Sequence, residues 1–326
     1  MRNYTNKTNI SPALAVFLLH DDYDVDERPN AISATTLLKP VRQMVLVQQN
    51  LDLAKEVDIS DLVASSMGTA IHDRCEIAWN CKETREKAFK LWGLNKETSD
   101  KIKINPTELK EGDIPVYVEQ RTSKEIDGFF VTGKFDLVLD GTLNDFKSTS
   151  VWTHIYDSNA ENYTLQGSIY KWLNPDKIKS DYININYIFT DWSSAKARQD
   201  SQYPQSRTLT KKYPLKSIEE TEFWIKDKLA LLKANLNTPQ EQLPYCTKEE
   251  LWETDTQYKY YKNPSSLSRA TKVFNTMEEA LARQSSEGGK GVIQEFKGEV
   301  KACRYCPAVN VCTQAQELIL EGRLTL

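Results

Sequence analysis

The dipeptide Asp140-Gly141 constrains the fold of this chain more than any other feature of the sequence. It separates two runs of strand-forming residues, GKFDLVLD and TLNDFKST. An Asp-Gly pair in this setting predicts a two-residue hairpin with a type I′ turn, because both central residues must adopt positive φ. Such a turn sets the register of the two strands, so that Asp136 is expected to lie opposite Asp145.

This register predicts a metal site. Directly opposed side chains have Cβ atoms roughly 4.5–5.5 Å apart, and two carboxylates at that spacing repel each other unless a cation lies between them. Mg²⁺ and Mn²⁺ favour oxygen ligands of this kind. Lys147 shares the strand face of Asp145 and could orient or deprotonate water, or neutralise charge on a phosphate. The alternative is a solvent-exposed hairpin face with an ordinary Asp–Lys ion pair.

Helical segments on both sides of the hairpin carry further candidates. The stretch GTAIHDRCE, within a long helix expected over residues 60–92, places His72 and Glu76 four apart on one face. The segment AENYTLQGSIYKWL does the same for Gln166 and Tyr170. A single histidine is more often structural than a ligand. These residues are significant as candidates because of their order along the chain. A helix, two strands joined by a turn, and a second helix carry them in succession.

That order of motifs resembles the PD-(D/E)XK nuclease superfamily, in particular its RecB-like exonuclease branch. The matching pieces are GTAIH, GKFD, DFK and QGSIY, and ISATTLL is similar to the segment that leads into the core of these proteins. The resemblance covers most of residues 30–190. It implies an α/β fold: a restriction-endonuclease-like core with a central mixed sheet flanked by helices, and a small C-terminal cysteine-cluster module.

The resemblance also assigns roles to residues. The implied metal ligands are His72, Asp136, Asp145 and the carbonyl of Phe146. Lys147 is implied to be the catalytic lysine, and Gln166 and Tyr170 are implied to hold the DNA strand near the site. Glu119, on the preceding strand, and Glu76 are further candidates, and a solvated strand charge is an equally good interpretation of Glu119.

The chemistry implied is hydrolysis of a DNA phosphodiester by metal-activated water, with one or two Mg²⁺ or Mn²⁺ ions that also stabilise the leaving oxygen. We therefore expect a metal-dependent DNA exonuclease of phage or bacterial recombination, repair or replication, acting on double-stranded ends or a single strand. Alternatives are a structure-specific or flap endonuclease and a catalytically inactive DNA-binding protein. Nucleases of this kind often act beside a single-strand annealing protein, so the resemblance implies such a partner.

A cysteine cluster is the second predicted site. The spacing C-x2-C-x5-C near the C-terminus belongs to Cys303, Cys306 and Cys312. Three closely spaced thiols need a fourth ligand to complete a zinc site or an iron–sulfur cluster. We predict Cys246, because it opens the same module, whereas Cys75 lies on the expected inner stripe of its helix and Cys81 has no partner motif.

The identity of the metal follows from the resemblance and not from spacing. By spacing alone zinc would serve as well as iron. The triplet resembles the iron–sulfur clasp of nucleases in the same branch, which favours a 4Fe–4S cluster. In those proteins the first cysteine lies upstream of the core, where this chain reads ISATTLLKPVRQ and has no cysteine.

Composition sets the remaining limits. The chain has 326 residues, a formal net charge of −4 and 27% charged residues, as in soluble globular proteins. No apolar run approaches the ~20 residues of a membrane span. Six cysteines without a secretion signal predict reduced thiols and a cytoplasmic location. EGGKG lacks the spacing of a phosphate-binding loop, so no nucleotide cofactor is expected.

The sequence predicts three parts. Residues 1–60 form a helical N-terminal segment packed on the core, residues 61–240 the nuclease core, and residues 241–326 the cysteine-cluster module. The stretch NTPQEQLP marks the last boundary. Just before it, SIEETEFWIKDKLALLKANL predicts an amphipathic helix that begins with a Ser217–Glu220 capping box.

Overall fold

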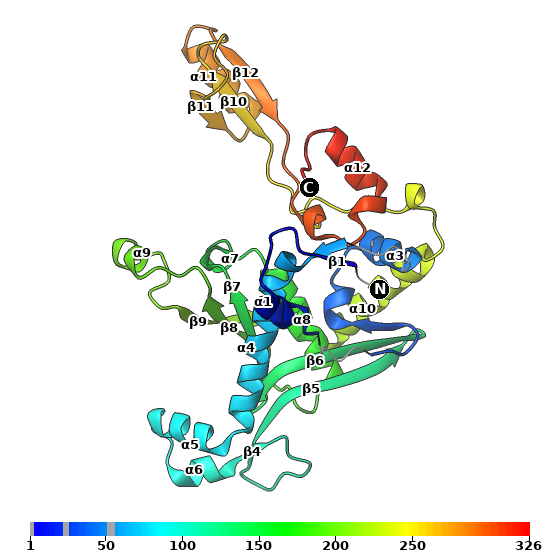
Figure 1. Cartoon of the computed structure of the whole chain (residues 1–326), viewed down its shortest axis with the longest axis vertical. Coiled ribbons are helices and arrows are strands. Elements are labelled where there is room, and N and C mark those ends of the chain that lie inside the picture. Colours follow the sequence, from blue (N-terminus) through cyan, green and yellow to red (C-terminus); the bar gives the residue numbers. More distant parts are fainter. Residues whose placement is uncertain (1–2, 22–25, 51–55) are drawn as a thin grey trace. The chain divides into compact units, whose positions relative to one another are not determined.

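The computed structural model divides into two compact units (Figure 1). It describes residues 3–21, 26–50 and 56–326. The first unit comprises Met1–Leu38 and Ala54–Ala230, and the second comprises Lys39–Leu53 and Leu231–Leu326. The second unit therefore includes a stretch that the sequence placed with the N-terminal segment. Within the described residues, no helix is long and apolar enough to cross a membrane.

The first unit is an α/β structure built on a curled mixed sheet of seven strands. Its path runs β4-β5-β6-β7-β8-β9, and β2 adds to β6. Three pairings are parallel (β4 with β5, β2 with β6, β7 with β8) and the others are antiparallel. The strands are β2 (Ala31–Ser33), β4 (Ile102–Ile104), β5 (Ile114–Ile126), β6 (Phe129–Leu139), β7 (Thr142–Thr149), β8 (Tyr182–Phe189) and β9 (Thr208–Pro214).

The predicted hairpin connects β6 and β7. Asp140 and Gly141 have φ values of 46° and 76°, as a type I′ turn requires. Leu139 pairs with Thr142, and the ladder continues through two further pairs in the expected register. The prediction of the turn and of the register next to it is therefore confirmed.

Helices cover both faces of this sheet. On one face, α4 (Val63–Asn80) contacts β5 and β7, and its Trp79 packs, as Phe146 of β7 does, against the buried cluster of Val116, Val118 and Leu137. On the other face lies α8 (Ala160–Leu173), where a Cβ added to Gly167 would lie 3.1 Å from the side chain of Ile183 on β8. The glycine lets α8 approach the sheet closely, which explains why more than half of this helix is buried.

The helical region before the sheet differs from the prediction in two ways. The single helix expected over residues 60–92 is wrong, because Cys81 adopts an extended conformation (φ −87°, ψ 113°) and separates α4 from α5 (Lys82–Leu91). Thr84 donates a hydrogen bond to Cys81 Sγ at 3.2 Å, which ties the start of α5 to this break. In addition, α4 has no fully buried residue, so Cys75 is only partly covered and its stripe is not a core face.

The remaining elements of the first unit complete its edges. A two-stranded parallel sheet joins the two short N-terminal strands. These elements are β1 (Asn3–Thr5), α1 (Pro12–Leu19), α2 (Ala34–Leu37), β3 (Glu56–Asp58), η1 (Ile59–Leu62), α6 (Lys96–Lys101), α7 (Val151–Ile155) and α9 (Ser194–Gln199).

The long helix α10 (Ile218–Asn235) begins as the sequence predicts. Ser217 N–H donates to Glu220 Oε2 at 2.8 Å, and Glu220 N–H donates to Ser217 Oγ at 3.1 Å. These reciprocal bonds satisfy two amide groups that the helix itself cannot pair. The predicted capping box is confirmed.

The second unit combines short helices with a small antiparallel sheet in the order β11-β10-β12. Helix α11 packs on this sheet, and Tyr260 and Ala280 are fully buried there. The elements are α3 (Val41–Gln49), η2 (Gln240–Gln242), β10 (Gln257–Tyr261), β11 (Lys272–Phe274), α11 (Met277–Ser286), β12 (Val292–Phe296), η3 (Ala302–Tyr305), η4 (Val309–Val311) and α12 (Thr313–Leu320).

Candidate metal centre

Three acidic residues occupy one level of the sheet on three neighbouring strands. Strand β5 pairs with β6 on both sides of Glu119 without a shift in register, which places Glu119 opposite Asp136. The pair Leu137–Asn144 is the last one between β6 and β7, and the next position in the same register sets Asp136 opposite Asp145. At this level the ladder between β5 and β6 is interrupted at one position and the ladder between β6 and β7 has ended, since neither acidic pair is part of a ladder.

The carboxylate of Asp136 accepts a backbone hydrogen bond from β7 just beyond the last pair of the ladder between β6 and β7. Its Oδ2 accepts a hydrogen bond from the N–H of Phe146 at 2.8 Å. Asp136 is therefore anchored to the strand that carries Asp145, and only 9% of its surface is exposed. The sequence singled out the carbonyl of Phe146 as a ligand, and the structure places the amide of this residue next to the predicted acidic pair.

At the level of Glu119, the side chains of β6 change the face of the sheet to which they point. The φ of 49° at Glu119 is left-handed, a conformation that costs a residue other than glycine on the order of 1–3 kcal/mol. Leu137 packs on the same side as Trp79 of α4, whereas a Cβ on Gly133 would meet Tyr170 of α8. In a regular strand Leu137 and Gly133 would point to the same face. The row of acids therefore lies where the alternation is broken.

His72 completes a group of potential metal ligands. Its Nδ1 lies 3.2 Å from Asp136 Oδ1 and 3.9 Å from Glu119 Oε1. Within the described part of the chain, His72, Glu119 and Asp136 are the group of three such side chains whose donor atoms all lie within 4.8 Å of one another. The hydrogen bond with Asp136 raises the pKa of His72 despite its partial burial. Glu76, one helical turn further along α4, is outside this group.

Glu119 belongs to the site, although the sequence ranked it as a weaker candidate. Burial raises the pKa of its carboxyl group, and an ion pair with Lys134 at 2.9 Å offsets only part of that effect. The interpretation of Glu119 as a solvated strand charge is wrong, because only 10% of the surface of its side chain is exposed. Sequence reasoning lacked the register between β5 and β6, which alone brings Glu119 to Asp136.

The buried Asp145 and the partly exposed Lys147 form an ion pair beside this group. Their Oδ2 and Nζ atoms are 2.6 Å apart, and Asp145 is only 1% exposed. Burial raises the pKa of Asp145 to about 6, with Lys147 opposing the shift. Burial by itself would lower the pKa of Lys147, but the attraction of Asp145 and Asp136 outweighs it and the net shift is upward. The solvent-exposed hairpin face considered as an alternative is therefore excluded.

The donor set fits a hard divalent cation. One imidazole nitrogen and two carboxylates converge, and a third carboxylate lies on the next strand. Mg²⁺ and Mn²⁺ favour carboxylate oxygens, and Mn²⁺ also accepts imidazole. A cation at this position would remove the repulsion between the opposed carboxylates. Lys147 would remain beside the ion as a fixed positive charge that faces the same space as the carboxylates.

The predicted pair on α8 is held together by its own hydrogen bond. Gln166 Nε2 donates to Tyr170 Oη at 3.0 Å, and the two residues are 8% and 5% exposed. Tyr170 lies over Gly133 of β6, where any larger side chain would collide with its ring. The structure thus brings both residues next to the strand of Asp136, largely covered by their surroundings.

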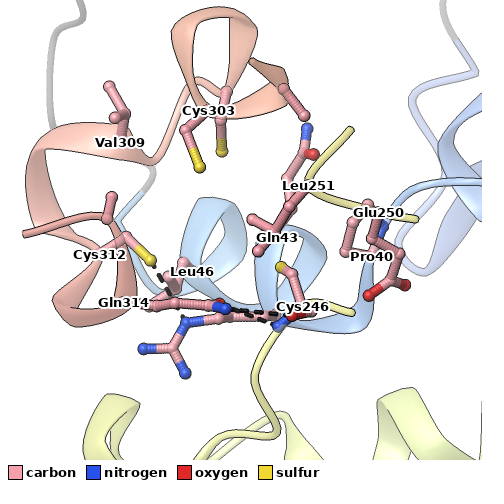
Figure 2. A pocket seen from close by; sticks show the side chains of 14 residues that line it. Pro40, Gln43, Leu46, Cys246, Glu250, Leu251, Cys303, Val309, Cys312 and Gln314 are labelled. Carbon is pink, nitrogen blue, oxygen red and sulfur yellow. Dashed lines mark hydrogen bonds between the residues drawn. The ribbon is translucent and has the colours of Figure 1, made fainter. Parts of the chain in front are cut away.

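The four predicted cysteines line one pocket of the second unit (Figure 2). The pocket lies between the segment with Cys303, Cys306 and Cys312, the loop with Cys246, and helix α3. No disulfide joins the six cysteines, all of which lie in the described part of the chain. Burial raises the pKa of Cys246 to about 12 and that of Cys303 to about 11. These thiols therefore stay protonated at neutral pH unless a cation binds them.

An arginine that sequence reasoning missed borders the same pocket. Arg42 of α3 is 2% exposed, and its Nε donates to Cys312 Sγ at 3.3 Å. Its other nitrogens donate to the carbonyl of Leu243 at 3.0 Å and to Thr313 Oγ1 at 2.6 Å. Among the described residues, no carboxylate lies within ion-pair distance of this guanidinium. The segment KPVRQ has no motif that would have indicated its role.

Comparisons with known proteins do not identify the chain. No family model matches it, and no curated protein matches it. One solved structure, described as "Crystal structure of SSO0001", aligns over 69% of this chain and 86% of its own, with 16% identity and a TM-score of 0.34. A likeness of this degree supports no statement about function.

Proposed function

We propose that this protein is a Mg²⁺- or Mn²⁺-dependent DNA exonuclease of the PD-(D/E)XK type, with a restriction-endonuclease-like core. The observation that carries the proposal is the group of His72, Glu119 and Asp136 beside the Asp145–Lys147 pair. The combination is specific, because a structural ion pair needs no second cluster of acids next to it. The order of the motifs along the chain supports the same assignment.

Some residues of the site would bind the metal, and others would contact the DNA. His72, Glu119, Asp136, Asp145 and the carbonyl of Phe146 would hold one or two ions. The bound ions would supply an activated water and stabilise the leaving oxygen. Lys147, kept cationic by Asp145, neutralises charge on the phosphate under attack. Asp145 positions that ammonium group at 2.6 Å, and Gln166 and Tyr170 fix the strand near it.

The proposal is tested with end-labelled linear DNA and closed circular DNA of the same sequence, in Mg²⁺, in Mn²⁺ and in chelator. An exonuclease degrades the linear substrate only and needs the metal. Asp145→Asn and Lys147→Ala should abolish cleavage, whereas Glu97→Gln, an exposed acid on α6, should not. Cleavage of the circle would instead identify an endonuclease. Metal-independent DNA binding without any cleavage would identify an inactive DNA-binding protein.

We also propose that Cys246, Cys303, Cys306 and Cys312 hold a 4Fe–4S cluster, with zinc as the alternative. All four line one pocket. The spacing of the cysteines along the chain suits zinc as well as iron. The choice of a 4Fe–4S cluster rests on the resemblance of the triplet to the iron–sulfur clasp of RecB-like nucleases.

The cluster assignment is tested on protein purified without oxygen. Cys246→Ser should lose the metal and the visible absorption of thiolate-bound iron, and Cys81→Ser, at the α4–α5 break, should lose neither. One zinc per chain in colourless protein would reverse the choice of metal. A single-strand annealing protein, as a partner, remains an expectation from the resemblance.

A further inference from the structure

A pair of exposed aromatic rings follows directly after the strand that carries Lys147. Trp152 and Tyr156 belong to α7 and the residue after it, which come just beyond the end of β7 (Figure 1). Their ring centroids are 5.9 Å apart with an interplanar angle of 22°, so the two rings are stacked. Trp152 is 44% exposed and Tyr156 is 73% exposed. Two large aromatic faces are thus open to solvent at one place.

The orientation of this pair is fixed by the other side of α7. Val151 is fully buried, and the ring of His154 lies 5.6 Å from Tyr187 and 5.8 Å from Phe189. Asp191 accepts hydrogen bonds from the amide of Val151 and from Ser150, each at 2.7 Å. Because residues four apart share a helix side, this anchoring turns Trp152 and Tyr156 outward together.

A lysine lies beside the aromatic pair, on a segment rich in basic residues. Lys196 of α9 places its Nζ 5.4 Å from the centre of the Trp152 ring. The segment 192–216 that carries it has six basic residues and one acidic residue, in a chain whose net charge is −4. Lys196, Arg198 and Arg207 are exposed. Aromatic faces that alternate with cations are typical of surfaces that bind single-stranded nucleic acid, where bases stack and phosphates are neutralised.

We propose that Trp152, Tyr156 and Lys196 form a stacking platform for a single strand of DNA. The aromatic rings would stack on bases, and Lys196 would contact the neighbouring phosphate. A duplex does not fit this role, because its base faces are covered by adjacent base pairs. That the bound strand leads to Lys147 rests on the proposed nuclease function; the binding of the strand does not.

The distance to the candidate metal centre suits this assignment. Lys147 and Trp152 are five residues apart, so their Cα atoms are at most ~17 Å apart even for a fully extended chain. Stacked bases rise ~3.4 Å per nucleotide. The platform therefore lies within about five nucleotides of the lysine, close enough to hold the strand whose terminal phosphodiester is cleaved.

The test measures binding without cleavage. The full-length protein, in chelator, is titrated into fluorescent oligothymidylate and into a duplex of equal length, and anisotropy is recorded. Loss of one stacked base weakens binding by about 5- to 150-fold, so Trp152→Ala should lower the affinity for the single strand within that range. Trp152→Phe should retain most of it, and the affinity for the duplex should not change. Lys196→Gln should reduce the salt dependence of binding.

Phe223→Ala is the matched control, because Phe223 is an exposed aromatic residue (74%) on α10 of the same unit. Circular dichroism melts confirm that each variant is folded. Equal single-strand affinity of Trp152→Ala, Phe223→Ala and the unchanged protein would overturn the platform, as would an equal loss for duplex. If the platform variant loses binding while Mg²⁺ supports no cleavage at all, the platform stands and the nuclease proposal fails.

Discussion

Replacement of Gly133 by alanine tests how closely α8 packs against the strand of the acidic row. The added Cβ would lie 2.8 Å from Tyr170 Cε1 and 2.9 Å from Leu173 Cδ1. Carbon atoms in contact prefer about 3.5–4.0 Å, so something must move. The helix has little freedom to move away, because Gly167 seats it against the sheet next to Leu215 and β8 in the same manner.

The expected cost follows from this geometry. Overpacking of a well-packed core typically destabilises a protein by about 1–3 kcal/mol. For a unit of this size each kcal/mol lowers the melting temperature by about 2–4 °C. Gly133→Ala should therefore lower the melting temperature of the first unit by about 2–12 °C. Activity should fall as well, because the ring of Tyr170 is pushed away from Gln166, its hydrogen-bond partner at 3.0 Å.

Gly68→Ala provides a control of opposite sign. Gly68 lies within α4, and the nearest atom to its added Cβ, Ser148 Oγ, is 3.8 Å away. Alanine in a helix is more stable than glycine by about 0.5–1 kcal/mol, so this variant should melt slightly higher. Both are followed by calorimetry, and metal binding by isothermal titration. A Gly133→Ala protein that melts at or above the unchanged protein would refute the close packing of α8.

Three further predictions concern single side chains. Lys147→Ala should lower the melting temperature of metal-free protein, because the buried Asp145 loses its partner; the double variant Asp145→Asn/Lys147→Met should recover stability in thermal melts but not cleavage. Arg42→Met removes a buried cation from the cysteine pocket, so a redox titration should show a lower reduction potential of the proposed 4Fe–4S cluster. Burial lowers the pKa of His154, so the unfolded chain binds a proton at this residue before the folded chain does. The free energy of unfolding should therefore fall as pH drops below ~6.5. His154→Phe should weaken this dependence of stability on pH.

Local rules allowed part of the fold to be predicted from the sequence alone. The Asp140-Gly141 turn and the capping box of Ser217 and Glu220 depend on backbone conformations and hydrogen bonds within a few residues. The meeting of Asp145 with Lys147 depends only on the alternation of side chains in a strand. Such features need no knowledge of the rest of the chain, because the interacting groups are close in sequence.

Tertiary structure decided the features that depend on distant segments. Glu119 becomes a candidate ligand because β5 and β6 pair in one register and because the backbone at Glu119 is left-handed, which only the surrounding sheet can enforce. The residues from Lys39 to Leu53 join the cysteine unit, where Arg42 reaches Cys312 across 270 positions of sequence. The burial of each charged group depends on contacts with distant parts of the chain, and a motif of a few residues does not specify these contacts.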